Sequence, residues 1–101
     1  MLLGDIVSEI RSKNAGPFWV TIDVFCGDTN TYEKVRSLLG KESVATLYQI
    51  PESQLQRYDI ENLHVVKFSF PRPVGQGSLL DRDMHGAQYS ILLSELPLAP
   101  S

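Results

Sequence analysis

The sequence has little of what several large classes of protein require. Its single cysteine, Cys26, excludes an internal disulfide, a CxxC zinc site and an iron–sulfur cluster held by this chain alone. No apolar run approaches the roughly 18 residues that span a bilayer, and the N-terminus lacks the basic and apolar regions of a signal peptide. Its 9 basic against 12 acidic side chains give a formal charge of -3, which does not attract nucleic acid or an anionic membrane. We therefore expect a cytoplasmic protein with no nucleic-acid partner and no membrane partner.

The composition is that of a folded protein. The chain has 101 residues, of which 43% are hydrophobic and 21% are charged, values typical of globular domains. Its prolines and glycines are scattered, and no repeat, low-complexity tract or charged block marks a linker. A chain of this length has room for one core, so we expect a single domain over residues 1–101.

The first half of the chain has the clearest periodicity. Residues Phe18 to Phe25 alternate, which predicts a strand with Phe18, Val20, Ile22 and Val24 on one face. Capping residues precede an amphipathic helix over Thr31 to Leu39, which ends at Gly40. A second short helix over Glu42 to Gln49, stopped by Pro51, is expected to add little to the core.

The remaining elements complete an α+β fold. Gln56 to Ile60 and Leu63 to Phe70 are predicted to pair as a hairpin, and Ala87 to Leu96 is predicted to be a last strand. Leu3 to Ile10 fits either a strand or one helical turn. The sum is a two-layer sandwich, with helices on one face of a mainly antiparallel sheet.

One helix layer does not cover two faces of a sheet. Trp19, Phe25 and Phe70 are expected on the face opposite Phe18 or at its edge, as large apolar groups without a cover. We therefore expect the chain to work as part of an oligomer.

A first polar cluster lies directly before the predicted strand that begins at Phe18. Arg11, Ser12, Lys13, Asn14 and the following glycine form a predicted turn suited to binding a carboxylate or phosphate. The alternative is a solvated turn, since turns are rich in Ser, Asn and Gly for backbone reasons alone. Lys13 is our catalytic candidate here, and Arg11, Ser12 and Asn14 are candidate substrate-binding residues.

A second polar cluster lies in a long stretch too polar for a core element. If this stretch is extended, Asp81, Asp83 and His85 project to one side. They would suit a histidine general base oriented by a carboxylate, with His85 and Asp83 catalytic and Asp81 in substrate binding. A divalent metal on the same three residues, with His64 as a further ligand, is the weaker alternative, and we predict no cofactor. The structural alternative is that Arg82 pairs with a neighbouring acid and that His85 bonds to backbone.

Arg72 and Cys26 lie outside these two clusters. Arg72 is held between Pro71 and Pro73, which restrict the backbone and would present it to a carboxylate ligand or a partner. Cys26 has Asp28 nearby and no basic residue to activate it, so we interpret it as a small apolar residue at a strand end.

Four segments together resemble a known family. They are Leu3-Gly4-Asp5-Ile6, Arg11-Ser12-Lys13-Asn14-Ala15-Gly16-Pro17-Phe18, Pro71-Arg72-Pro73 and Asp81-Arg82-Asp83-Met84-His85-Gly86-Ala87-Gln88. In order and spacing they resemble a domain-of-unknown-function family of about one hundred residues. That family is similar to the ferredoxin-like domain associated with AtuA proteins of acyclic terpene utilisation. The counterparts of that domain's motifs are Gly4-Asp5, Arg11-Ser12 and the stretch from Tyr58 to His64.

The resemblance implies a ferredoxin-like sandwich without an iron–sulfur cluster and a larger AtuA-type partner. It also adds Gln88 to the candidate substrate-binding residues, and it supplies no reaction. After Arg11-Ser12 this chain has Lys13-Asn14-Ala15-Gly16 in place of the motif residues of the AtuA-associated domain, so the ligand bound by this turn can differ.

The leading hypothesis is an accessory subunit of a heteromeric metabolic enzyme that contributes a polar organic-acid pocket. The alternatives are a stand-alone homo-oligomeric enzyme acting on an organic acid, of lyase or isomerase type, and a purely structural binding module.

Overall fold

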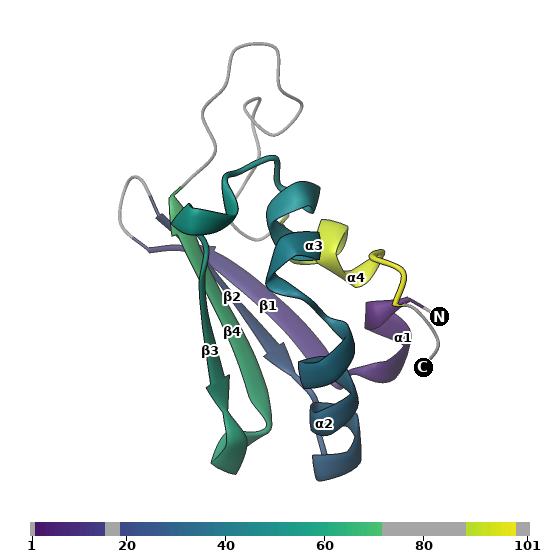
Figure 1. Cartoon of the computed structure of the whole chain (residues 1–101). Helices are drawn as coiled ribbons and strands as arrows, with labels where there is room; N and C mark the ends of the chain where they lie inside the picture. Colours follow the sequence, from purple (N-terminus) through teal and green to yellow (C-terminus); the bar gives the residue numbers. More distant parts are fainter. Residues whose placement is uncertain (1, 16–18, 72–88, 99–101) are drawn as a thin grey trace.

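Four antiparallel strands form one sheet in the order β1-β2-β4-β3. The structure is a computed structural model that describes residues 2–15, 19–71 and 89–98. The strands are β1 (Glu9–Asn14), β2 (Trp19–Phe25), β3 (Gln56–Ile60) and β4 (Val65–Pro71). Helices cover one face of this sheet, as Figure 1 shows, so the predicted α+β sandwich is confirmed.

The side chains of the central strand β2 alternate between buried and less buried positions. Val20, Ile22 and Val24 are fully buried, whereas Trp19 is exposed and Thr21, Asp23 and Phe25 are half-buried. Side chains of a strand alternate between faces, so one face of β2 enters the core and the other does not. The predicted strand is confirmed over the described residues, and Phe18 lies outside them.

Two helices follow β2 and pack on its buried side. Helix α2 (Thr29–Leu38) begins where the Asp28 side chain accepts a hydrogen bond from the Thr31 backbone N–H at 2.7 Å. Its Val35 is fully buried, as the amphipathic pattern predicted. Helix α3 (Lys41–Leu47) is also confirmed. Our expectation that it adds little to the core is wrong, because Val44 and Tyr48 are fully buried.

The C-terminal segment is a helix, α4 (Tyr89–Ser94), and not the predicted last strand. Tyr89 and Leu93, one helical turn apart, are both fully buried. The place beside β2 that a last strand would take is occupied by β1. A short run of four apolar residues is compatible with either a helix or a strand. Because β1 already occupies the edge of the sheet, this segment packs in the helix layer instead.

The N-terminal segment forms both of the structures that the sequence left open. Helix α1 (Leu3–Ile6) is one turn long, and β1 begins at Glu9. The Leu3 N–H donates to the Leu96 carbonyl at 2.9 Å, and Leu2 forms an isolated β-bridge with Pro97. The two ends of the described chain therefore lie side by side (Figure 1).

The predicted hairpin is present at the other edge of the sheet. Strand β3 follows a 3-10 turn, η1 (Glu52–Gln54), and joins β4 through a second one, η2 (Glu61–Leu63), and His64. His64 adopts a left-handed backbone conformation, with φ 54°. This conformation completes the reversal that β3 and β4 need in order to pair.

The strand order is that of a ferredoxin-like sandwich whose last strand comes first in the chain. Strands β2 and β3 run parallel on either side of β4, with α2 and α3 between them in sequence, which is a split βαβ unit. Helix α4 follows β4, and β1 takes the remaining edge beside β2. The arrangement is compatible with the fold that the family resemblance implied.

Aromatic rings fill the core between β4, α3 and α4. The ring of Tyr48 stacks on that of Phe70 with centroids 5.0 Å apart, and Tyr89 lies 5.5 Å from Tyr48. The Tyr48 hydroxyl donates to the Tyr89 carbonyl at 2.5 Å, and burial raises the pKa of that hydroxyl. Phe70 is fully buried here, so our placement of it on the uncovered face is wrong.

Within the described segments, no helix combines the length and the apolar character that crossing a bilayer requires.

Candidate functional site

The face of the sheet away from the helices is the candidate site, and we call it the open face (Figure 1). Strand register defines its members, because residues paired across antiparallel strands project to the same side. The residues of this face are Glu9, Arg11, Lys13, Trp19, Thr21, Asp23, Phe25, Gln56, Tyr58, Ile60, Val65, Lys67, Ser69 and Pro71. Trp19 is 40% exposed and Tyr58 49% exposed, so this face presents large aromatic groups. The prediction that Trp19 and Phe25 lie opposite the core face is confirmed.

Arg11 and Lys13 belong to β1, and the predicted turn at this position is wrong. The segment pairs with β2 from Glu9 to Asn14, with Arg11 opposite Asp23 and Lys13 opposite Thr21. The physical reason is that half-buried Ile10 and Ser12 alternate with exposed Arg11 and Lys13, which satisfies a strand with one buried side. The same alternation places both cations on the open face.

Ser12 and Asn14 do not join these cations. They occupy the alternate positions of β1, which face the helix layer. The Ser12 hydroxyl accepts a hydrogen bond from the Ser90 backbone N–H at 2.9 Å, so it ties the first turn of α4 to the sheet. The predicted grouping of Ser12 and Asn14 with Arg11 and Lys13 in one turn is therefore wrong.

A cavity of about 190 Å³ lies beside the two cations. It is lined by Arg11, Ser12, Lys13, Asp23 and Phe25. Asp23 is paired in register with Arg11 on one side and with Lys67 on the other. Within the described part of the chain, none of these cations has an ion pair with Asp23. Their charges are therefore available to an anionic ligand or partner.

Thr21 places an unused polar atom on the same face. Its Oγ1 atom is buried and has no hydrogen-bond partner among the residues described. Lys13 of β1 is its cross-strand neighbour. A buried hydroxyl without a partner costs free energy unless something bonds to it, so this position is suited to contact with a bound group.

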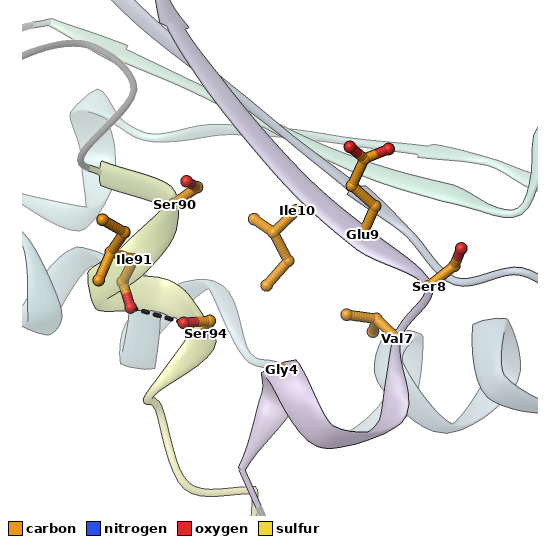
Figure 2. Close-up of a pocket in the computed structure, with 8 residues that line it drawn as sticks. All are labelled: Gly4, Val7, Ser8, Glu9, Ile10, Ser90, Ile91 and Ser94. Carbon is orange, nitrogen blue, oxygen red and sulfur yellow. Dashed lines mark hydrogen bonds between the residues drawn. The ribbon is translucent and has the colours of Figure 1, made fainter.

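A second cavity, also about 190 Å³, lies at the outer side of β1. Figure 2 shows that its walls come from α1, the start of β1 and α4, with Ile10 and Val7 directed into it and serine hydroxyls around it. The Ser94 hydroxyl donates to the Ile91 carbonyl at 2.7 Å. Its lining holds one carboxylate, Glu9, and no cation, so an anion is better matched by the open face.

His64 and Cys26 lie near the N-terminus of α2. The Nε2 atom of His64 is 3.0 Å from the Thr29 hydroxyl, and the His64 carbonyl accepts from the Cys26 N–H at 2.9 Å. Burial, with a smaller contribution from the Asp28 charge, raises the pKa of the Cys26 thiol to about 11. A thiol with this pKa is a poor nucleophile at neutral pH, in agreement with our interpretation of Cys26 as a small buried residue.

The other predicted site residues, namely Arg72, Asp81, Asp83, His85 and Gln88, lie outside the described residues. Whether the second polar cluster meets the first stays a prediction. Among the described residues, no group of three or more His, Cys, Asp or Glu side chains could hold a metal ion.

Asp23 and Lys67 are charged residues of the open face that sequence reasoning did not include among the candidate site residues. Asp23 and Lys67 join Arg11 in one cross-strand row, yet they lie far apart in the sequence. The available signal was the alternation of polar residues in β2 and β4. It could identify the outward positions of each strand, but not which strands are neighbours.

The fold and this site define a small α+β sandwich with one open, charged and aromatic sheet face. The family model described as domain of unknown function (DUF4387) matches residues 3–97. The chain belongs to this family. No curated protein and no solved structure matches it.

Proposed function

We propose that this chain is an accessory subunit of a heteromeric metabolic enzyme and that its open face docks on a larger AtuA-type protein. The observation that carries the proposal is the open face itself, on which Trp19 and Tyr58 are exposed. Aromatic residues are enriched at protein interfaces, where they supply most of the binding energy when buried. The identity of the partner rests on the resemblance of the segments that include Gly4-Asp5 and Arg11-Ser12 to a domain associated with AtuA proteins.

The same face supports a role in organic-acid binding. Arg11 and Lys13 line a cavity there, and a docked partner would exclude water from it. Removing water strengthens the attraction between a guanidinium or ammonium group and a carboxylate. The proposal keeps His85, oriented by Asp83, as the group that moves a proton, with Arg72, Asp81 and Gln88 in substrate binding. The assembled enzyme is proposed to be cytoplasmic.

Association is tested by producing the tagged chain together with the larger AtuA-type protein and measuring the mass of the complex by light scattering. We expect one heteromeric species with the native chain. Trp19→Asp should abolish it, because a charge would replace an aromatic anchor. Ile91→Asp is the matched control, since Ile91 is also exposed, at 57%, but lies on α4 away from the open face.

The outcomes separate the alternatives. If the complex forms equally well with Trp19→Asp, the open face is not the docking surface. If the native chain forms no complex with the larger protein but forms a homo-oligomer that Trp19→Asp dissociates, the stand-alone homo-oligomeric enzyme replaces the accessory subunit as the proposed function.

The proposed catalytic role of Lys13 and His85 is tested by measuring turnover of the assembled enzyme. Lys13→Ala and His85→Ala should each reduce it, and unchanged turnover with lower thermal stability would leave both residues a structural role only.

A further inference from the structure

The charge of the open-face cavity limits the ligand that it can take. Arg11, Lys13 and Asp23 line it, two cations and one carboxylate, so the lining carries a single net positive charge. A ligand with one negative charge neutralises this lining. A dicarboxylate would bring a second carboxylate to Asp23, and like charges at close range repel each other.

The surroundings of Asp23 favour a hydroxyl over an ammonium group as the second polar group of the ligand. Asp23 lies in register between Arg11 and Lys67, so cations already flank it on both neighbouring strands. An ammonium group would be a third cation at this point. A hydroxyl adds no charge and can donate a hydrogen bond to the carboxylate, and a hydrogen bond to a charged acceptor is stronger than one between neutral groups.

Size and shape add a further restriction. A volume of about 190 Å³ corresponds to about six water molecules at roughly 30 Å³ each. The ring of Phe25, two positions after Asp23 on the same face, is part of the lining and offers an apolar contact. The ligand is therefore a few carbons long, with some of its hydrocarbon against this ring.

We propose that this cavity binds a small hydroxy monocarboxylic acid. Arg11 and Lys13 hold its carboxylate, and Asp23 accepts a hydrogen bond from its hydroxyl. The inference rests on the proposed function and names the class of its ligand. Thr21, the cross-strand neighbour of Lys13, adds a buried Oγ1 atom that has no hydrogen-bond partner among the described residues and could also bond to the carboxylate.

The test is a titration of the full chain, followed by the amide resonances of β1 and β2, with four probes of similar size. Lactate has the carboxylate and the hydroxyl, propionate lacks the hydroxyl, alanine has an ammonium group in its place, and malate has a second carboxylate. We expect lactate to bind at least about tenfold more tightly than the other three, as the loss of a charge-assisted hydrogen bond predicts.

Substitutions of the three charged lining residues test which of them contacts the carboxylate and which contacts the hydroxyl. Arg11→Gln and Lys13→Gln should each weaken lactate binding about tenfold or more, and Asp23→Asn should reduce the preference for lactate over propionate. Lys34→Gln, at an exposed lysine of α2, is the matched control and should bind as the native chain does. Equal binding of lactate and propionate, tighter binding of alanine or malate, no binding of any probe, or unchanged binding in both cation variants would each overturn the proposal.

The titration is independent of the association test. A chain that docks on its partner but shows no preference for lactate would retain the proposed function and lose only this ligand class. A chain that prefers lactate but forms no complex would lose the accessory role and retain the site.

Discussion

The two faces of one sheet use the same strands for opposite purposes. On the covered face, Ile22, Phe68 and their neighbours are fully buried against helices. On the open face, adjacent positions of the same strands carry Asp23, Lys67 and exposed Trp19. The covered face provides the core that stabilises the fold, so the open face is free to carry charged and aromatic residues that the fold does not need. Substitutions one residue apart should therefore separate stability from binding.

The largest effect is expected from a charge on the covered face. Ile22→Asp buries a carboxylate without a partner, which costs about 4 kcal/mol or more and is enough to unfold a domain of this size. Asp23→Ile, the next residue, should change the free energy of unfolding by less than about 0.5 kcal/mol. Thermal melting followed by circular dichroism measures both. Similar losses for the two variants would contradict the division between the faces.

Helix α4 repeats the comparison on a smaller scale. Leu93 is fully buried and Ile91 is 57% exposed, two residues apart on one helix. Leu93→Ala should cost about 2–5 kcal/mol, because it leaves a cavity, whereas Ile91→Ala should cost less than about 0.5 kcal/mol. Denaturant unfolding gives both values. The opposite order would show that α4 has been placed with the wrong side toward the core.

A single buried hydrogen bond should have a smaller effect than a cavity. Tyr48→Phe keeps the ring stacked on Phe70 but removes the donor to the Tyr89 carbonyl. The expected cost is about 1 kcal/mol, with the native fold retained. Tyr58→Phe, which loses an exposed hydroxyl bonded to Gln56, is the open-face control and should have almost no effect on the unfolding midpoint.

The smallest effect is expected at the exposed start of α2. The backbone N–H and then the side chain of Thr31, both hydrogen-bonded to Asp28, lower the pKa of that carboxyl. A carboxyl whose pKa is lowered by folding stabilises the fold above its ordinary pKa, and this contribution is lost as the pH falls through the folded value. Asp28→Asn keeps a capping side chain but does not titrate.

Melting curves from neutral to acidic pH test this prediction. The stability of the native chain should fall more steeply with acid than that of Asp28→Asn, and Asp28→Ala should be less stable than both near neutral pH. Parallel pH curves for the native chain and Asp28→Asn would exclude a contribution from this carboxyl.

The parts of the fold predicted correctly are those with long periodic patterns. The alternation that buries Val20, Ile22 and Val24 and the helical spacing that buries Tyr32 and Val35 each identify an element without reference to the rest of the chain. The error at Tyr89 to Leu93 came from a short apolar run, which fits a helix or a strand. A last strand is excluded only because β1 already pairs with β2 at that edge, and this pairing cannot be deduced from the segment itself.

The candidate site was predicted in part for the same reason. Arg11 and Lys13 were found because they are close in sequence, but the partners on their face, Asp23 and Lys67, come from strands that only register brings together. Ser12 was grouped with the cations because it lies between them in the sequence, in what the composition predicted to be a turn. In a strand, adjacent residues point to opposite faces, and Ser12 bonds to α4 instead.

The contact between Leu2 and Pro97 has a consequence for how this fold relates to others. Joining the two ends of the described chain and opening it between β1 and β2 would give the element order of an ordinary ferredoxin-like sandwich, with β1 last. Such a circular permutant would keep every strand pairing and the whole open face. One cut and one ligation would then convert one topology into the other, a change that domains with adjacent termini tolerate.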